Sequence, residues 1–139
     1  MNRLKYILRA KNQYNIQSPF VYDLYENVIA PRLDSATLAR IGAGRHDRFA
    51  QLCFKLADHY DARETDNDKR LASADVRLLC PDGSLIALVR RPHSSTASEQ
   101  AWECLFKDPD ATLSVDIYDV GLVFTSQRLA RQHFLFREF

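Results

Sequence analysis

Three residues that can do chemistry directly follow a continuous apolar run in the stretch SLIALVRRPHSS. They are Arg90, Arg91 and His93, and the run covers residues 85–89. Such a run between turn residues is typical of a strand covered on both faces, and α/β proteins bind ligands beyond the carboxyl ends of these strands. Arginine binds carboxylates and phosphates, and histidine exchanges protons near neutral pH. The three residues are therefore candidate contacts for an anion or a partner, with a solvated basic loop as the alternative.

The other motifs favour structural roles. The glycine-rich run at residues 41–44 follows a helical pattern rather than a strand, so a loop between helices is favoured over a nucleotide-binding turn. Asp116 and Asp119 belong to a strand and a turn, so a joint acid–base role is not expected. Three further histidines lie apart, without a second ligand at metal-binding spacing: His46, His59 and His133. These patterns assign no catalytic, cofactor-binding or metal-binding residue.

The composition is that of one globular domain over residues 1–139, with 46% hydrophobic and 27% charged residues. A formal net charge of +1 does not favour nucleic-acid binding. No apolar run approaches the roughly 18 residues of a membrane span, and the basic N-terminus lacks the apolar core of a signal peptide. Three widely spaced cysteines fit neither a disulfide framework nor a zinc site. We therefore expect a cytoplasmic protein with buried, reduced thiols that contacts neither membranes nor nucleic acid.

Hydrophobic periodicity divides the chain into a helical part at residues 1–60, a polar loop at 61–70 and an α/β part at 71–139. In the helical part, the apolar spacing predicts helices over residues 2–12, 19–30 and 47–60. In the α/β part, it predicts helices over residues 71–79 and 96–106, and strands over 85–89, 111–118, 121–124 and 132–139. This order is that of an α/β or α+β domain.

Two blocks of the sequence resemble one known family. NQYNIQSPFVYDLYENVI is similar to the N-terminal helical segment of a group of bacterial class I S-adenosylmethionine-dependent methyltransferases, where His-Ser-Pro-Phe-Val is typical and Gln17 replaces the histidine here. The C-terminal block begins at Ala101-Trp102 and runs through DATLSVDIYDVGLVFTSQRLARQHFLFREF. It resembles the family's Ala-Trp helix, a strand ending in Asp, a Gly-hydrophobic-Val-Phe strand and a Gln-His-Phe strand. RFAQLCFKLADHYDA is similar to the helix before the family's cofactor-binding strand.

The chain departs from this family where the cofactor would bind. The resemblance implies a Glu-Leu-Gly-x-x-x-Gly strand after the helix at 47–60, but the polar residues 61–70 follow instead. Relatives tend to carry aspartates at the end of the strand that corresponds to residues 85–89, and this chain has Arg90-Arg91. Two positive charges there repel a divalent cation and the cofactor's sulfonium. The resemblance thus implies a reduced Rossmann-like remnant, with a small mixed sheet of three or four strands and helices packed on it.

These features lead to three hypotheses about function. The first is a shortened, non-catalytic methyltransferase-like domain that acts through self-association or with a full-length relative. Lost central strands expose apolar surface, which must be covered by repacking, by a partner or by self-association. The second is an active methyltransferase that completes its S-adenosylmethionine site across an interface. The third is an anion-binding module that uses Arg90, Arg91 and His93.

Overall fold

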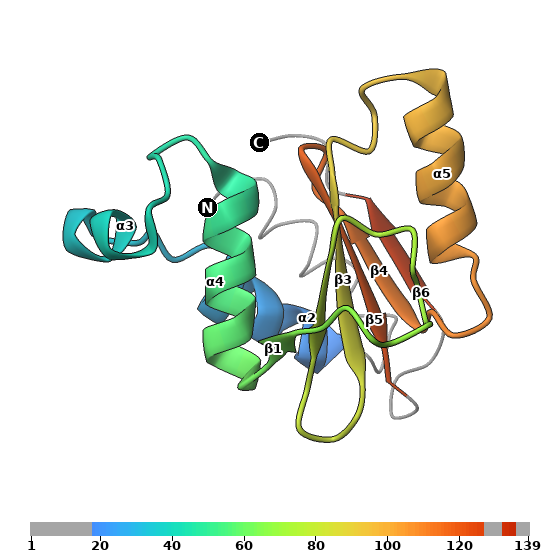
Figure 1. Ribbon diagram of the computed structural model, residues 1–139, viewed down its shortest axis with the longest axis horizontal. Coiled ribbons are helices and arrows are strands. Elements are labelled where there is room, and N and C mark those ends of the chain that lie inside the picture. The colour runs from blue at the N-terminus through green and yellow to red at the C-terminus, as the bar shows by residue number, and fades with distance from the viewer. Residues whose placement is uncertain (1–17, 127–131, 136–139) are drawn as a thin grey trace.

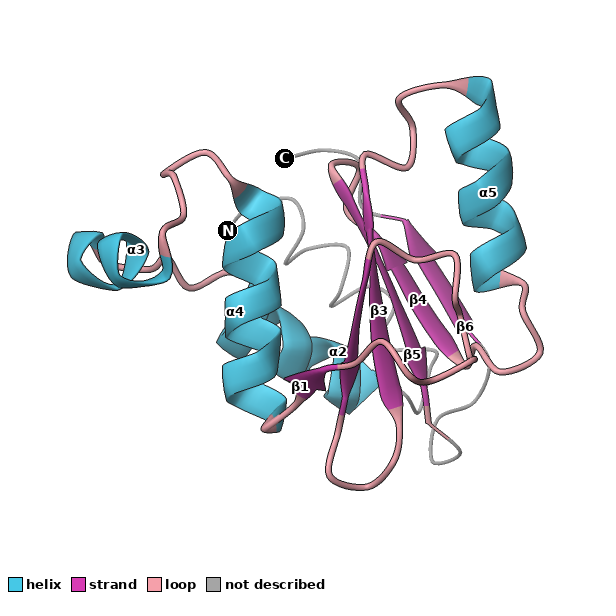
Figure 2. Ribbon diagram, viewed as in Figure 1, coloured by secondary structure: helices cyan, strands magenta, loops and turns pink. Residues whose placement is uncertain are grey.

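Short apolar strands, each bounded by turn residues, form one mixed sheet with helices on both faces (Figures 1 and 2). The computed structural model describes residues 18–126 and 132–135. Its helices are α2 (Ser18–Leu24), the π-helix η1 (Tyr25–Ile29), α3 (Ser35–Ile41), α4 (Arg48–Tyr60) and α5 (Thr96–Phe106). Its strands are β1 (Arg63–Glu64), β2 (Val76–Leu79), β3 (Leu85–Arg90), β4 (Leu113–Asp116), β5 (Val120–Thr125) and β6 (Gln132–Leu135). The helix expected over residues 2–12 lies outside the described residues.

The strand order in the sheet is β1-β2-β3-β5-β4-β6. Both β3 and β4 pair antiparallel with β5, so β3 and β4 run parallel to each other with β5 between them. Helix α5 connects β3 to β4 and covers one face, and the tight β4–β5 hairpin returns the chain into the middle of the sheet (Figure 1). Only β4 and β6 pair in parallel among the described strands. The α/β class is as expected, and its strands are mainly antiparallel.

The sheet has six strands, so the expected count of three or four is wrong. The helix expected over residues 71–79 is also wrong, because Val76–Leu79 form β2 and pair antiparallel with β3. The turn at residues 81–84 joins them: Asp82 Oδ1 accepts hydrogen bonds from both the N–H and the hydroxyl of Ser84, and Gly83 has a φ of +86°. Pairing with β3 satisfies the backbone polar groups of β2, which outweighs local helix propensity.

The polar segment 61–70 is attached to this sheet rather than freely solvated. Arg63 and Glu64 pair with the end of β2. The Arg77 guanidinium of β2 donates to the carbonyls of Asp68 and Arg70. Hydrogen bonds from Arg70 lower the pKa of the Asp68 carboxyl to about 2. One arginine in the strand thus organises a segment whose one apolar residue in the core is Ala62.

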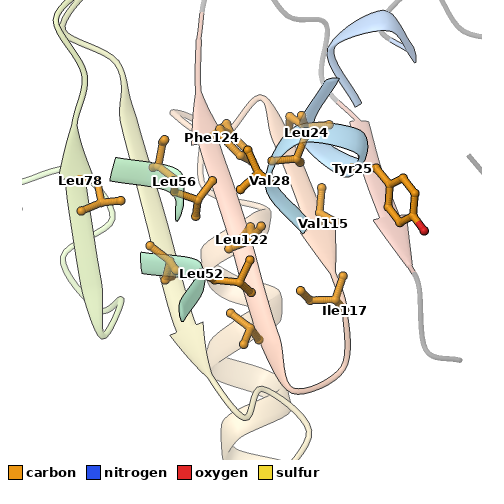
Figure 3. Packing of buried hydrophobic residues seen from close by; sticks show 14 of the residues in the cluster. Leu24, Tyr25, Val28, Leu52, Leu56, Leu78, Val115, Ile117, Leu122 and Phe124 are labelled. Carbon is orange, nitrogen blue, oxygen red and sulfur yellow. The ribbon is translucent and has the colours of Figure 1, made fainter. Parts of the chain in front are cut away.

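The two faces of the sheet bury two separate sets of apolar side chains. Alternate residues of the central strands face α2, η1 and α4, where they pack against Leu24, Val28, Leu52 and Leu56 (Figure 3). The intervening residues Ala87 and Val123 face Trp102 and Leu105 of α5. This alternation produces three layers, with the N-terminal helices on one side of the sheet and α5 on the other.

The helices of this chain cover both faces of its own sheet. Among the described residues, the large apolar side chains that stay exposed are Leu79 at 37% and Tyr118 at 51%. No helix in residues 18–126 or 132–135 has both the length and the apolar character needed to cross a membrane. Of the three ways to cover apolar faces that the sequence leaves open, repacking within the chain is the one seen in the described residues.

The three cysteines are free thiols, but they are not uniformly buried. Cys104 is exposed on α5, so the expectation of a buried thiol is wrong there. Cys53 is half-buried, and burial raises the pKa of its thiol to about 11. Burial also raises the pKa of the Cys80 thiol.

Candidate functional site

The loops that follow β3 and β4 meet at one end of the sheet. Arg90 ends β3 and Asp116 ends β4, and the two residues pair with consecutive residues of β5. The backbone N–H of Arg91 donates to the carbonyl of Asp119, at 2.9 Å, and ties the two loops together. This is the end of the sheet at which the sequence places a candidate site.

His93 lies between two carboxylates at this end. Its Nε2 lies 2.5 Å from Asp116 Oδ2, and its Nδ1 lies 2.8 Å from Glu99 Oε2. The side chains of His93 and Asp116 are 9% and 1% exposed, whereas that of Glu99 is 53% exposed. Ionised carboxylates only accept hydrogen bonds, so this arrangement favours the imidazolium form, in which both ring nitrogens donate.

Asp116 is a buried carboxylate whose two oxygens both have partners. The Trp102 indole Nε1–H donates to Oδ2, at 3.2 Å, and the Tyr118 backbone N–H donates to Oδ1, at 2.9 Å. A charge removed from water is tolerated only when it is paired and hydrogen-bonded in this way. We call the group His93, Glu99, Asp116 and Trp102 the His93 clamp.

Local sequence explains how the His93 clamp is assembled. The Ser95 hydroxyl caps α5 by accepting from the Ser98 N–H, at 3.0 Å, which places Glu99 in the first turn beside His93. Trp102 follows Glu99 at helical spacing and reaches the sheet at Gly121. A Cβ atom at Gly121 would lie 2.5 Å from Trp102 Cζ3, so only glycine leaves room for the indole ring.

Two residues beside the His93 clamp have backbone conformations that side chains rarely adopt. Arg91 has a φ of +49° and Tyr118 a φ of +70°. The Asp119 N–H donates to the Ile117 carbonyl, so Tyr118 is the centre of a γ-turn of the strained, positive-φ type. The Tyr118 ring stacks on the His93 ring, with centroids 5.2 Å apart. Strained residues of this kind persist where surrounding contacts hold them in place.

The three predicted contact residues, Arg90, Arg91 and His93, do not lie together at one site. The Arg90 guanidinium lies over the Phe49 ring of α4, 4.3 Å from its centroid, and therefore on the α4 face. Arg91 is exposed. His93 lies on the α5 face, and both of its ring nitrogens face carboxylates. An anion-binding role for the three residues together stays a prediction. An anion at His93 has to compete with the carboxylates of Glu99 and Asp116 for the two ring nitrogens.

Sequence reasoning missed the partners of His93. The sequence suggests Asp119 as the only carboxylate to pair with Asp116, but the structure buries Asp116 in the His93 clamp and leaves Asp119 exposed. The available signal was the strand-end position of Asp116 and the placement of Glu99 in the first turn of the next helix. Neither signal indicates contact with His93 without the sheet order.

Two of the other described histidines, His59 and His133, have side-chain partners of their own. His59 Nε2 lies 3.0 Å from Asp23 Oδ2. His133 Nδ1 lies 2.5 Å from the Ser114 hydroxyl, and its ring stacks on Phe106. Within residues 18–126 and 132–135, no three side chains of the metal-binding types are grouped to hold an ion.

The His93 clamp differs from a nucleophilic triad because both histidine nitrogens face carboxylates. The nearby Ser94 and Ser95 hydroxyls donate instead to the Ser98 hydroxyl. The His93 clamp therefore holds α5 and the loops that follow β3 and β4 together. Comparisons of the chain with family models, curated proteins and solved structures find no match.

Proposed function

We propose that this chain is a shortened, non-catalytic methyltransferase-like domain that works by binding a partner. One observation carries the proposal: the His93 clamp fills the region beyond β3 and β4 with side chains that satisfy one another. A cofactor at the strand ends, where an α/β enzyme would hold it, would have to displace the buried His93–Asp116 pair.

The strand directions support a non-catalytic role. In doubly wound proteins, the cofactor crevice opens at the carboxyl ends of parallel strands, where the strand order reverses. Here both neighbours of β3, the strands β2 and β5, run antiparallel to it. A crevice of that type therefore has no parallel neighbour of β3 to be built on.

The order of elements supports the methyltransferase-like part of the proposal. The Ala101-Trp102 segment is in α5, Asp116 ends β4, and the Gly121 segment is in β5. Strand β6 begins at Gln132. This is the helix–strand–strand–strand order that the resemblance implies.

Titration calorimetry tests the lack of a cofactor site. We expect neither S-adenosylmethionine nor S-adenosylhomocysteine to bind, because the strand ends are filled and carry Arg90 and Arg91. A known methyltransferase of this class, titrated with the same ligand solutions, is the positive control. Tight, stoichiometric binding to this chain would instead favour an active enzyme that completes its site across an interface.

The proposed partner is a second copy of the chain or a full-length relative, bound at the surface of Tyr118 and Arg91. Among the described residues, Tyr118 and Leu79 are the exposed large apolar side chains, and Tyr118 is the more exposed of the two. We expect light scattering to show self-association that Tyr118→Asn weakens, since asparagine tolerates positive φ better than most residues. Leu79→Asn is the matched control and should leave the measured mass unchanged. A stable monomer at all concentrations would leave only the full-length relative as a partner.

A further inference from the structure

An open cavity of about 940 Å³ lies on the α4 side of the protein and shares no lining residue with the His93 clamp. It is bounded by the end of η1, the segment leading to α3, α3 itself and the first half of α4. Helix α3 stands out from the rest of the molecule (Figure 1) and has no buried residue. The volume is in the range of sites that bind small organic molecules.

The charged side chains that line this cavity are mainly positive. The cations come from three segments, and they are Arg32, Arg45, Arg48 and Lys55. The carboxylates are Asp34, which caps α3 through the Thr37 N–H, and Asp119, which lies 3.8 Å from Arg48. The lining therefore has a surplus of two positive charges, in a chain whose formal net charge is +1. Arg32 and Arg45 form no ion pair with any residue that the structure describes.

Lys55 is a partly buried cation at the cavity wall. Its ammonium donates to the carbonyls of Ile29 and Pro31, at 3.3 and 2.9 Å, and so is held at the end of η1. Burial, with a contribution from the Arg48 guanidinium, lowers the pKa of Lys55 to about 8. A bound anion would oppose this repulsion between neighbouring cations.

The loop that carries Arg45 is held in place by the chain itself. The Gln51 side-chain amide of α4 donates to the carbonyls of Gly44 and Arg45, at 2.8 and 3.0 Å. An arginine on a backbone fixed in this way loses less freedom on binding than one on a loose loop. Between the charges, the lining is apolar, with Ile29, Leu33 and Leu38.

We propose that this cavity binds an organic phosphate monoester, with the phosphate at Arg32 and Arg45 and the apolar part against Leu33 and Leu38. A phosphate monoester carries close to two negative charges at neutral pH, which matches the surplus of two positive charges. Guanidinium groups bind phosphate oxygens through paired hydrogen bonds. The site does not depend on the methyltransferase resemblance, and it uses none of the residues Arg90, Arg91 and His93.

Titration calorimetry with phenyl phosphate, inorganic phosphate and phenol tests the proposal. We expect phenyl phosphate to bind more tightly than inorganic phosphate, phenol not to bind, and added salt to weaken the binding. Arg45→Gln and Arg32→Gln should each weaken phenyl phosphate about tenfold, the usual effect of losing a charged hydrogen bond. Arg63→Gln, in β1 and outside the cavity, is the matched control and should leave the affinity unchanged.

Three results would overturn the proposal. These are no binding of phenyl phosphate to the folded wild-type chain, binding of phenol as tight as that of phenyl phosphate, and equal losses in Arg45→Gln and Arg63→Gln. Both arginine side chains at the site are exposed, so circular dichroism should show the variants folded like the wild type. The S-adenosylmethionine titration tests the proposed function separately, so failure of one proposal does not imply failure of the other.

Discussion

Gly121→Ala is expected to destabilise the fold by about 3 kcal/mol or more, because the new methyl group overlaps the Trp102 ring. The Cβ atom would lie 2.5 to 2.9 Å from three carbons of that ring. The ring is rigid and its Nε1–H is hydrogen-bonded to Asp116, so moving the ring also disturbs the His93 clamp. Urea unfolding, followed by circular dichroism, measures the loss.

Gly44→Ala is the matched control for this measurement. A Cβ atom at Gly44 has no neighbour within 4 Å, and no positive φ disfavours a side chain there. We expect a change within about 0.5 kcal/mol, as for most surface substitutions. Equal effects of the two substitutions would show that Trp102 does not pack on β5 as described.

Asp116→Ala is expected to destabilise the fold by about 3–5 kcal/mol, the usual cost of removing one partner of a buried ion pair. The substitution leaves His93 Nε2, the indole N–H of Trp102 and the backbone N–H of Tyr118 without their partner. Asp116→Asn keeps the size and one acceptor oxygen, so its effect should be smaller. Glu99 is half exposed, so Glu99→Ala should cost at most about 1 kcal/mol.

Asp119→Ala is the control for a carboxylate at the same end of the sheet. Its side chain is 63% exposed and its ion pair with Arg48 is long, so we expect a change of about 0–1 kcal/mol. A gain of stability in Asp116→Ala would contradict the proposed role of the His93 clamp in holding the two loops and α5 together. It would favour a working site, since active-site residues are often retained at the expense of stability.

Most helices and strands that have a strong local sequence pattern are predicted correctly. The strand over residues 85–89 and the helix over 96–106 are present as β3 and α5, and the helix over 47–60 is α4. Each of these segments has a clear apolar period and a capping or turn residue at its end. Such signals act over a few residues, so no knowledge of the rest of the chain is needed.

The predicted secondary structure is wrong where the same residues fit both a helical and a strand pattern. Residues 71–79 contain enough leucine and alanine for a helix, yet Val76–Leu79 form a strand. The deciding contact is the ladder with β3, across the turn at Asp82 and Gly83. A backbone pairing of this kind has no signature within the paired segment itself, and the missed strand accounts for part of the error in the strand count.

The sequence by itself determined the α/β class, the strand that leads to Arg90, Arg91 and His93, and the helix that follows them. Only the tertiary structure decided what those residues face. Sheet order brings Asp116, which is 23 positions away, to His93. The packing of α4 on the other face of the sheet places the Phe49 ring under Arg90. The packing of η1, α3 and α4 brings together the cations of the α3–α4 cavity. The physical reason is that local periodicity decides which face of an element is apolar, whereas charges meet only after those faces have packed.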